Sequence, residues 1–347
     1  MSGGLGEITL RPAEPDEVAA CGVVWRDAIN DYLRPLGQGD IPDELGPIGR
    51  LHAHTRATDP ERFLVALRPA STTNGRPGHI ATIGHRDGLG SEVVAFGSAI
   101  VRGAEDRVSA GQVGALWYLS MLFVQPDAQG VGLGRAILER LLPAPDFGGS
   151  LATAVDSLQP ISTALYSRYG LGPRMPILHL VGTVRDEGTL APLPSGVTAT
   201  PFESIAVGPP GGAGHHELVE IVDGLDREVL GVAHPEDHRF LRMEGRLGFV
   251  YRGPDHQPLA YGYASPVGRV GPIAVRDSAL LGPIVGHLLA TVPARGATAI
   301  WIPGDAGPLL ATLLRAGLRT EDFPLLLCWD RAFADFSRYV PISPGLL

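Results

Sequence analysis

The chain has 347 residues, of which 44% are hydrophobic, and this is enough to fill the cores of two domains of ordinary size. Its formal net charge of −9 argues against nucleic acid as a main partner, because neutralising phosphates requires a basic surface. The only cysteines are Cys21 and Cys328, far apart and without neighbours at ligand spacing, so we expect neither a disulfide framework nor a metal site.

The N-terminus lacks the basic and apolar regions of a signal peptide, and no apolar run approaches the roughly 20 residues that span a bilayer. We therefore expect a soluble, cytoplasmic protein with no membrane partner.

The first third of the chain alternates between strand and helix patterns. The expected elements are a strand over 7–11, helices over 16–33 and 45–55, and two paired strands over 63–67 and 93–101, with a turn-rich insertion over 69–78. Acidic residues gather near the end of the first helix, where they either attract a cationic substrate or form a solvated surface. They are Asp27, Asp31, Asp40, Asp43 and Glu44.

A glycine-rich segment then joins an apolar strand over 119–124 to a helix over 136–142. Gly130, Gly132 and Gly134 leave several backbone N–H groups uncovered, and the N-terminus of the helix adds roughly half a positive charge. These features predict a phosphate site, although a glycine-rich connection without a ligand is the alternative. A Rossmann site would need a different glycine spacing, and a Walker P-loop would need Lys where this chain has Arg135.

The residues from Val124 to Arg135 resemble the V-x-P-x-x-Q/R-x-x-G-x-G/A signature of the GNAT superfamily of N-acetyltransferases. In that family this turn wraps the pyrophosphate of acetyl-coenzyme A (acetyl-CoA), and the strand before it contacts the pantetheine arm. The resemblance implies that acetyl-CoA is the co-substrate. The cofactor-binding residues that it implies are Leu122, Phe123, Val124, Gln129, Gly130, Val131, Gly132, Leu133, Gly134 and Arg135.

A second segment, over 164–171, follows a short strand expected over 151–155 and is similar to the A-x-L-Y-x-x-x-G-F stretch of the same family. The resemblance implies that Tyr166 is the proton donor to the leaving thiolate. The alternative is that Tyr166 is an aromatic residue of the core. Where the family often has Asn, this chain has Gln159 and Pro160, which puts one hydrogen bond to the cofactor in doubt.

With a further strand over 175–181, the element order matches the β-α-α-β-β-β-α-β-α-β order of the acetyltransferase fold. We therefore predict an α/β (α+β) protein with two tandem domains, each a central mixed sheet flanked by helices. The expected boundaries are a catalytic domain over 1–183, a linker over 184–196 and a second domain over 197–347.

The second domain resembles a degenerate copy of the first. The matching elements are a hairpin over 247–251 and 259–264, a strand over 270–275, helices over 279–292 and 309–317, and a strand over 325–330. Leu280, Pro283 and Leu313 stand where the first copy has Gln129, Gly132 and Tyr166, so we expect no cofactor in the second copy. Its role is then to support the fold, shape the acceptor cleft or form a homodimer. His215 and His216 are expected on a solvated loop, without a metal.

The general base is not evident, because residues 115–124 carry no charge and Ala154 stands where some relatives have Glu. Asp156 shares a strand face with Ala154 and is one candidate, acting through water. The other candidate is the C-terminal carboxylate of Leu347, since the apolar end of the chain looks anchored.

The sequence thus predicts an enzyme that transfers the acetyl group of acetyl-CoA to a primary amine of a small molecule in a direct ternary complex. One alternative is a longer acyl-CoA or a protein N-terminus as substrate. Another is a non-catalytic module that binds acyl-CoA. Transfer from an aminoacyl-tRNA on the same fold fits poorly with the acidic charge.

Overall fold

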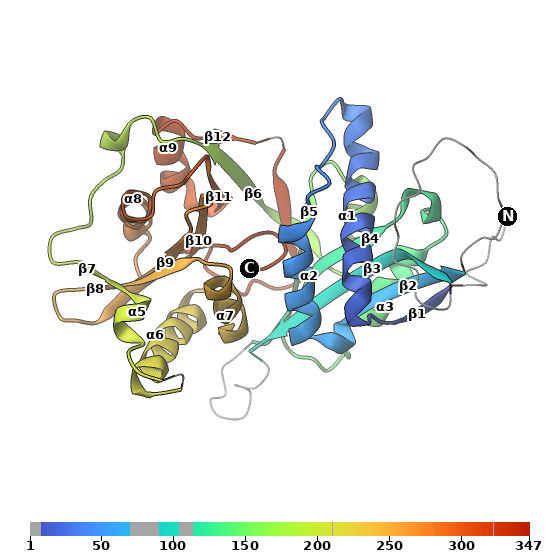
Figure 1. Ribbon diagram of the computed structural model, residues 1–347, viewed down its shortest axis with the longest axis horizontal. Coiled ribbons are helices and arrows are strands. Elements are labelled where there is room, and N and C mark those ends of the chain that lie inside the picture. Colours follow the sequence, from blue (N-terminus) through green and yellow to red (C-terminus); the bar gives the residue numbers. More distant parts are fainter. Residues whose placement is uncertain (1–7, 70–89, 104–113, 210, 322) are drawn as a thin grey trace. The chain divides into compact units, whose positions relative to one another are not determined.

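The structure is a computed structural model that describes residues 8–69, 90–103, 114–209, 211–321 and 323–347 (Figure 1). Most of the predicted insertion over 69–78 therefore lies outside the described residues. The chain forms two compact units, one of residues 1–101 and 117–147, the other of residues 102–116 and 148–347.

The first unit contains four strands in the order β1-β2-β3-β4, in which β1 and β2, and β2 and β3, are antiparallel. Its strands are β1 (Thr9–Pro12), β2 (Phe63–Pro69), β3 (Ser91–Arg102) and β4 (Leu116–Val124), and its helices are α1 (Val18–Leu33), α2 (Gly46–Thr58) and α3 (Leu133–Leu141). Every element predicted here from the sequence is present, which confirms the mixed α/β fold class.

Two neighbouring residues of β3 decide what packs on each side of this sheet, because successive side chains of a strand point to opposite faces. Phe96 belongs to a buried cluster with Cys21 and Val24 of α1. Gly97 leaves room for α3, since a Cβ at this position would lie only 2.5 Å from Cγ2 of Ile137.

The second unit contains a sheet with the order β5-β13-β6-β11-β10-β9-β8-β7, with β12 beside β6 and β14 beside β10. The strands are β5 (Ser150–Asp156), β6 (Gly172–Gly182), β7 (Thr198–Pro201), β8 (Leu247–Arg252), β9 (Pro258–Ala264), β10 (Arg269–Val275), β11 (Thr298–Pro303), β12 (Arg319–Thr320), β13 (Leu325–Trp329) and β14 (Tyr339–Val340). The helices are α4 (Pro160–Ser167), α5 (Phe202–Ile205), α6 (Ala213–Val229), α7 (Pro235–Met243), α8 (Leu281–Thr291) and α9 (Gly307–Arg315).

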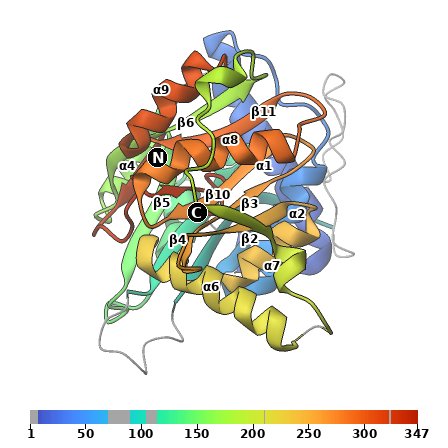
Figure 2. The same cartoon turned by 90° about the vertical axis from the view of Figure 1, so that its left-hand side faces the viewer.

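The acetyltransferase element order occurs twice along the chain. From β7 onward the strands and helices follow the sequence seen from β1 to β6, with α6 and α7 before β8, α8 after β10 and α9 after β11. Figure 2 looks onto this second copy, with α8 across the middle of the view and α6 below it. As in β3, a glycine of β9 admits the helix, since a Cβ on Gly262 would lie 3.1 Å from Leu288 of α8.

Helices α6 and α7 and strand β11 of the second copy were not predicted from the sequence. His215 and His216, predicted on a loop, lie instead in the first turn of α6. The glycine-rich run just before this helix hid its start, because glycine and proline are typical of loops.

The last strands of the two copies are exchanged within the second unit. Strand β13 lies between β5 and β6, so that Leu327 is paired with Ala154 on one side and Met175 on the other. Strand β6 pairs instead with β11, the counterpart of β5 in the second copy. Leu190 and Leu193, from the predicted linker over 184–196, pack against the core of this unit. The domain boundary itself stays a prediction.

A buried histidine of the first unit gives a testable consequence for stability. His52 of α2 is 0% exposed, and neither ring nitrogen has a hydrogen-bond partner in the described structure. Its ring lies against Phe63 and Phe96, with centroids 6.0 and 4.9 Å away. Burial lowers the pKa of His52 from 6.5 to about 3, because the charged imidazolium would lose its hydration.

We expect His52 to make folding depend on pH. Below pH 6.5 His52 becomes protonated in the unfolded chain but stays neutral in the folded chain. The free energy of unfolding therefore decreases as the pH falls towards 3. The loss is about 1.4 kcal/mol per pH unit, or about 2 kcal/mol at pH 5. Urea denaturation of wild type and His52→Phe between pH 7 and pH 5 measures it, and the variant should lose this part of the slope.

His54→Phe, on the same helix but only partly buried, is the matched control and should keep the wild-type slope. Equal pH slopes for wild type and His52→Phe would contradict a neutral, buried His52.

Candidate functional site

The predicted phosphate turn forms between β4 and α3 in the first unit. After Val124 the chain makes one 3-10 turn, Pro126–Ala128, and α3 begins at Leu133. Gly130 and Gly132 have φ angles of 81° and 88°, in the left-handed region that favours glycine. The glycine spacing that identified the turn in the sequence is thus required by its backbone.

The backbone N–H groups of this turn can receive an anion. Within the described part of the chain, the amides of residues 130–135 have no backbone acceptor, and the first bond of the helix runs from the N–H of Ala136 to the carbonyl of Gly132. Gln129, Gly130 and Val131 are exposed, whereas Leu133 is buried and anchors the turn in the core. Exposed amides at the start of a helix favour a phosphate group.

The other predicted cofactor residues lie next to this turn. Leu122, Phe123 and Val124 form the half-buried end of β4, while the strand is fully buried from Leu116 to Ser120. The side-chain amide of Gln129 donates to the carbonyl of Val124 at 3.1 Å, so it braces the turn.

The flanking helix positions also stay accessible. The φ angle of Gly134 does not lie in the left-handed region, so the backbone does not require glycine here. A Cβ at this position would contact Val124 at an ordinary distance of 3.6 Å. Arg135 is 58% exposed and lies 4.0 Å from Glu139.

A pocket of about 440 Å³ lies beside this turn in the first unit, between α1, the start of β3 and the residues after β4. Most of its charged groups are carboxylates, and its polar lining consists of Asp27, Asp31, Arg34, Glu92, Gln125 and Asp127. Such a lining favours a cationic ligand over an anionic one.

Hydrogen bonds hold these carboxylates in place. The side-chain amide of Gln125 donates to Asp27 at 3.2 Å, and Arg68 donates to Glu92 and Asp127 at 3.1 and 2.9 Å. Glu92 and Asp127 were not predicted as part of an acidic pocket, because only the folded chain brings β3 and the turn to α1.

The other acidic residues predicted near α1 have different surroundings. Asp40 forms a bidentate salt bridge with Arg34, and the hydrogen bonds from Arg34 lower the pKa of this exposed carboxyl below its usual value. Asp43 accepts from Arg26 at 2.5 Å. Neither of them, nor Glu44, lines the pocket.

The predicted proton donor, Tyr166, belongs to the second unit and is the buried residue of α4, with 5% exposure. Its hydroxyl is hydrogen-bonded to Ser162, and burial raises its pKa above 10. Tyr166 is therefore a neutral phenol that holds a proton at physiological pH.

The two predicted candidates for the base also lie in the second unit. Asp156 ends β5 and accepts the N–H of Leu158 at 2.9 Å. Leu346 and Leu347 are buried, at 0% and 5% exposure, and Ser343 forms a bridge with Leu346. The end of the chain is thus anchored by packing, as its apolar sequence suggested.

In the second copy, the positions equivalent to the phosphate turn are closed. Asp277 accepts the N–H of Ala279 at 2.9 Å, so its carboxylate caps the 3-10 turn Ser278–Leu280 that leads into α8. Pro283 lies in the first turn of α8, and Leu313 is fully buried in the core.

The C-terminal segment closes the second copy further. Strands β10 and β11 pair only at their starts, where Arg269 and Val270 face Ala299 and Ile300. Beyond Val270, β14 pairs with β10 in place of β11, and Val340 lies opposite Ile273. The tail therefore occupies the edge of β10 that β11 leaves unpaired.

Comparisons with known proteins agree with this architecture at the level of fold. No protein-family model matches the sequence, and a comparison with curated protein sequences gave no significant match. Among solved structures, a candidate acetyltransferase from Pyrococcus horikoshii superposes with a TM-score of 0.64 at 13% identity, covering 99% of this chain and 97% of that one.

Two further structures are GCN5-related N-acetyltransferases. The one from Sphaerobacter thermophilus has a TM-score of 0.52 at 16% identity and covers 95% of this chain and 98% of its own. The one from Anabaena variabilis has a TM-score of 0.52 at 9% identity and covers 92% and 72%. The chain thus has the acetyltransferase fold, in the two-copy arrangement described above. Among the described residues, no helix is both long and apolar enough to cross a bilayer.

Proposed function

We propose that this protein is an N-acetyltransferase that moves the acetyl group of acetyl-CoA to a primary amine of a small molecule. The observation that carries the proposal is the turn between β4 and α3, where exposed amides follow a half-buried strand end and two glycines adopt left-handed φ angles. The acetyltransferase fold supports the same chemistry.

In the proposed complex, the amides of residues 130–135 and the start of α3 hold the pyrophosphate, with Arg135 beside it. Backbone groups of Leu122, Phe123 and Val124 bind the pantetheine arm, and an N–H near Leu122 stabilises the thioester oxygen as it gains charge.

The transfer then needs two proton movements. The amine nitrogen attacks the thioester carbon, a C–N bond forms, and the C–S bond breaks. A base takes the proton from the amine, and the candidates are Asp156 through a water molecule or the carboxylate of Leu347. The hydroxyl of Tyr166 gives its proton to the leaving thiolate and recovers it from solvent.

The acidic pocket supports an ammonium compound as the acceptor. Three of its four carboxylates have arginine partners, since Arg26 pairs with Asp27, and Arg68 with Glu92 and Asp127. Asp31 of α1 is exposed and is the carboxylate that we expect to attract the substrate. A positively charged substrate would be attracted there as an ammonium ion. It becomes nucleophilic only after it loses a proton.

The first test uses Gly132→Pro, which removes an amide of the turn and cannot adopt the φ of 88°. We expect calorimetric titration with acetyl-CoA to give one site per chain for the wild type and no binding for the variant. Gly134→Ala is the control and should bind within a few-fold of wild type, since its Cβ meets only Val124 at 3.6 Å. Two sites per chain would overturn the closed second copy, and an unchanged Gly132→Pro would overturn the site.

The second test separates catalysis from binding. Tyr166→Phe should lower kcat for thiol release about 100-fold or more while leaving the Kd for acetyl-CoA unchanged, because only the acid is lost. Tyr169→Phe, one turn on, serves as the matched control. A Tyr166→Phe protein with full turnover would remove Tyr166 from the mechanism, and a wild type that binds without turnover with any amine would indicate a non-catalytic binding module.

The third test concerns the acceptor. Asp31→Asn should raise the KM for cationic amines several-fold with kcat unchanged, because one exposed charge contributes about 0.2 to 1 kcal/mol. The effect should shrink at high salt. Asp16→Asn removes the same charge outside the pocket and should leave KM unchanged. Equal KM values for all three proteins would argue against electrostatic selection of the amine.

A further inference from the structure

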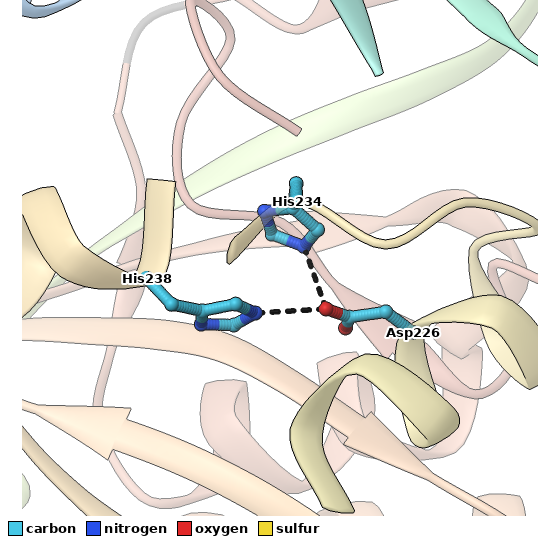
Figure 3. Close-up of side chains that lie close together, drawn as sticks. All are labelled: Asp226, His234 and His238. Carbon is cyan, nitrogen blue, oxygen red and sulfur yellow. Dashed lines mark hydrogen bonds and ion pairs between the residues drawn. The ribbon is translucent and has the colours of Figure 1, made fainter. Parts of the chain in front are cut away.

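Three side chains of the second unit converge in a buried cluster that plays no part in the proposed transfer. Asp226 comes from the last turn of α6, His234 directly precedes α7, and His238 lies one turn into α7. Figure 3 shows both imidazole rings pointing toward the same carboxylate. The three residues are 0%, 1% and 4% exposed.

The ligand atoms lie at distances typical of a metal site. Nε2 of His238 is 2.8 Å and Nε2 of His234 is 3.3 Å from Oδ2 of Asp226, and the three ligand atoms all lie within 4.8 Å of one another. Atoms bound to one Zn²⁺ at about 2.0 to 2.2 Å are separated by roughly 2.9 Å at right angles and roughly 3.3 Å in a tetrahedron.

His234 brings a buried imidazole to this cluster, between two carboxylates. Its side chain is almost completely buried, and each of its ring nitrogens faces a carboxylate, Nε2 that of Asp226 and Nδ1 that of Asp237. A cation bound to Nε2 would interact with the Asp226 carboxylate in place of the proton that an ion pair with Asp226 requires.

The outer partners of the cluster would hold the ligands in orientation. Nδ1 of His238 is 3.0 Å from the hydroxyl of Tyr263, and the hydroxyl of Tyr261 donates to Oδ1 of Asp226 at 2.5 Å. Metal-binding histidines usually use their second nitrogen in this way.

The third ligand has an acidic neighbour as well. Nδ1 of His234 lies 3.5 Å from Oδ2 of Asp237, which Arg102 fixes through two hydrogen bonds of 2.8 and 2.9 Å. A carboxylate behind a metal-binding imidazole raises the basicity of the ligand.

We propose that Asp226, His234 and His238 bind one divalent transition-metal ion, with Zn²⁺ as the best match. Two imidazoles and a carboxylate suit zinc and related ions better than Mg²⁺ or Ca²⁺, which prefer oxygen ligands. The ion joins the end of α6 to the start of α7 and leaves one coordination position for water. His238 also lines a pocket of about 560 Å³.

The test measures metal binding directly, with untagged protein stripped by a chelator. Calorimetric titration with ZnCl₂ should give one ion per chain, and His234→Gln and His238→Gln should each weaken binding at least 100-fold. His215→Gln with His216→Gln removes the nearby histidines of α6 and should leave binding unchanged. Zinc should also raise the melting temperature of the wild type but not of the cluster variants.

Spectroscopy of the wild type covers the case in which a cluster variant does not fold. Co²⁺ added to stripped wild-type protein should give visible d–d bands of a four- or five-coordinate site, and one equivalent of Zn²⁺ should abolish them. No binding by the folded wild type, or binding that the His215 and His216 substitutions remove, would overturn the proposal. Acetyl-CoA titration is independent of this result, because the predicted cofactor residues lie in the first unit.

Discussion

The exchange of β6 and β13 is the constraint on which the second unit depends. Each copy of the acetyltransferase order ends in a strand that pairs with the penultimate strand of the other copy, β13 with β5 and β6 with β11. Cys328 in the middle of β13 is fully buried, and burial raises the pKa of its thiol to about 12. A strand buried between two neighbours satisfies all its backbone groups only when both are present. Neither β6 nor β13 therefore completes its pairing without the other copy.

The copies have kept the same scaffold while their ligand positions have diverged. A glycine in the third strand of each copy, Gly97 and Gly262, lets the following helix approach the sheet. At the start of that helix the first copy has Gly132 with exposed amides, whereas the second has Pro283 in its first turn and the carboxylate of Asp277 on the 3-10 turn before it. Both copies thus have the glycine that admits a helix, while the left-handed Gly132 at the start of that helix belongs to the first copy.

The sequence predicted what depends on local pattern. The glycine turn, the order of elements in the first copy and the loss of that turn at Pro283 all follow from residues close in the chain. The exchange of strands could not be predicted, because it depends on pairing between strands that are far apart in the chain, such as β5 with β13. Glu92 and Asp127 of the acidic pocket, and Asp226 with His234 and His238, were missed for the same reason, since each set comes from separate elements.

The C-terminal tail completes a strand edge of the second copy. Where β10 and β11 diverge, an unpaired strand edge would expose N–H and C=O groups that need partners. Strand β14 supplies the missing hydrogen bonds from the chain itself, and Tyr339 and Val340 are fully buried beside β10. The sheet of the second copy therefore has backbone partners at this edge that belong to the chain itself, which stabilise the edge permanently.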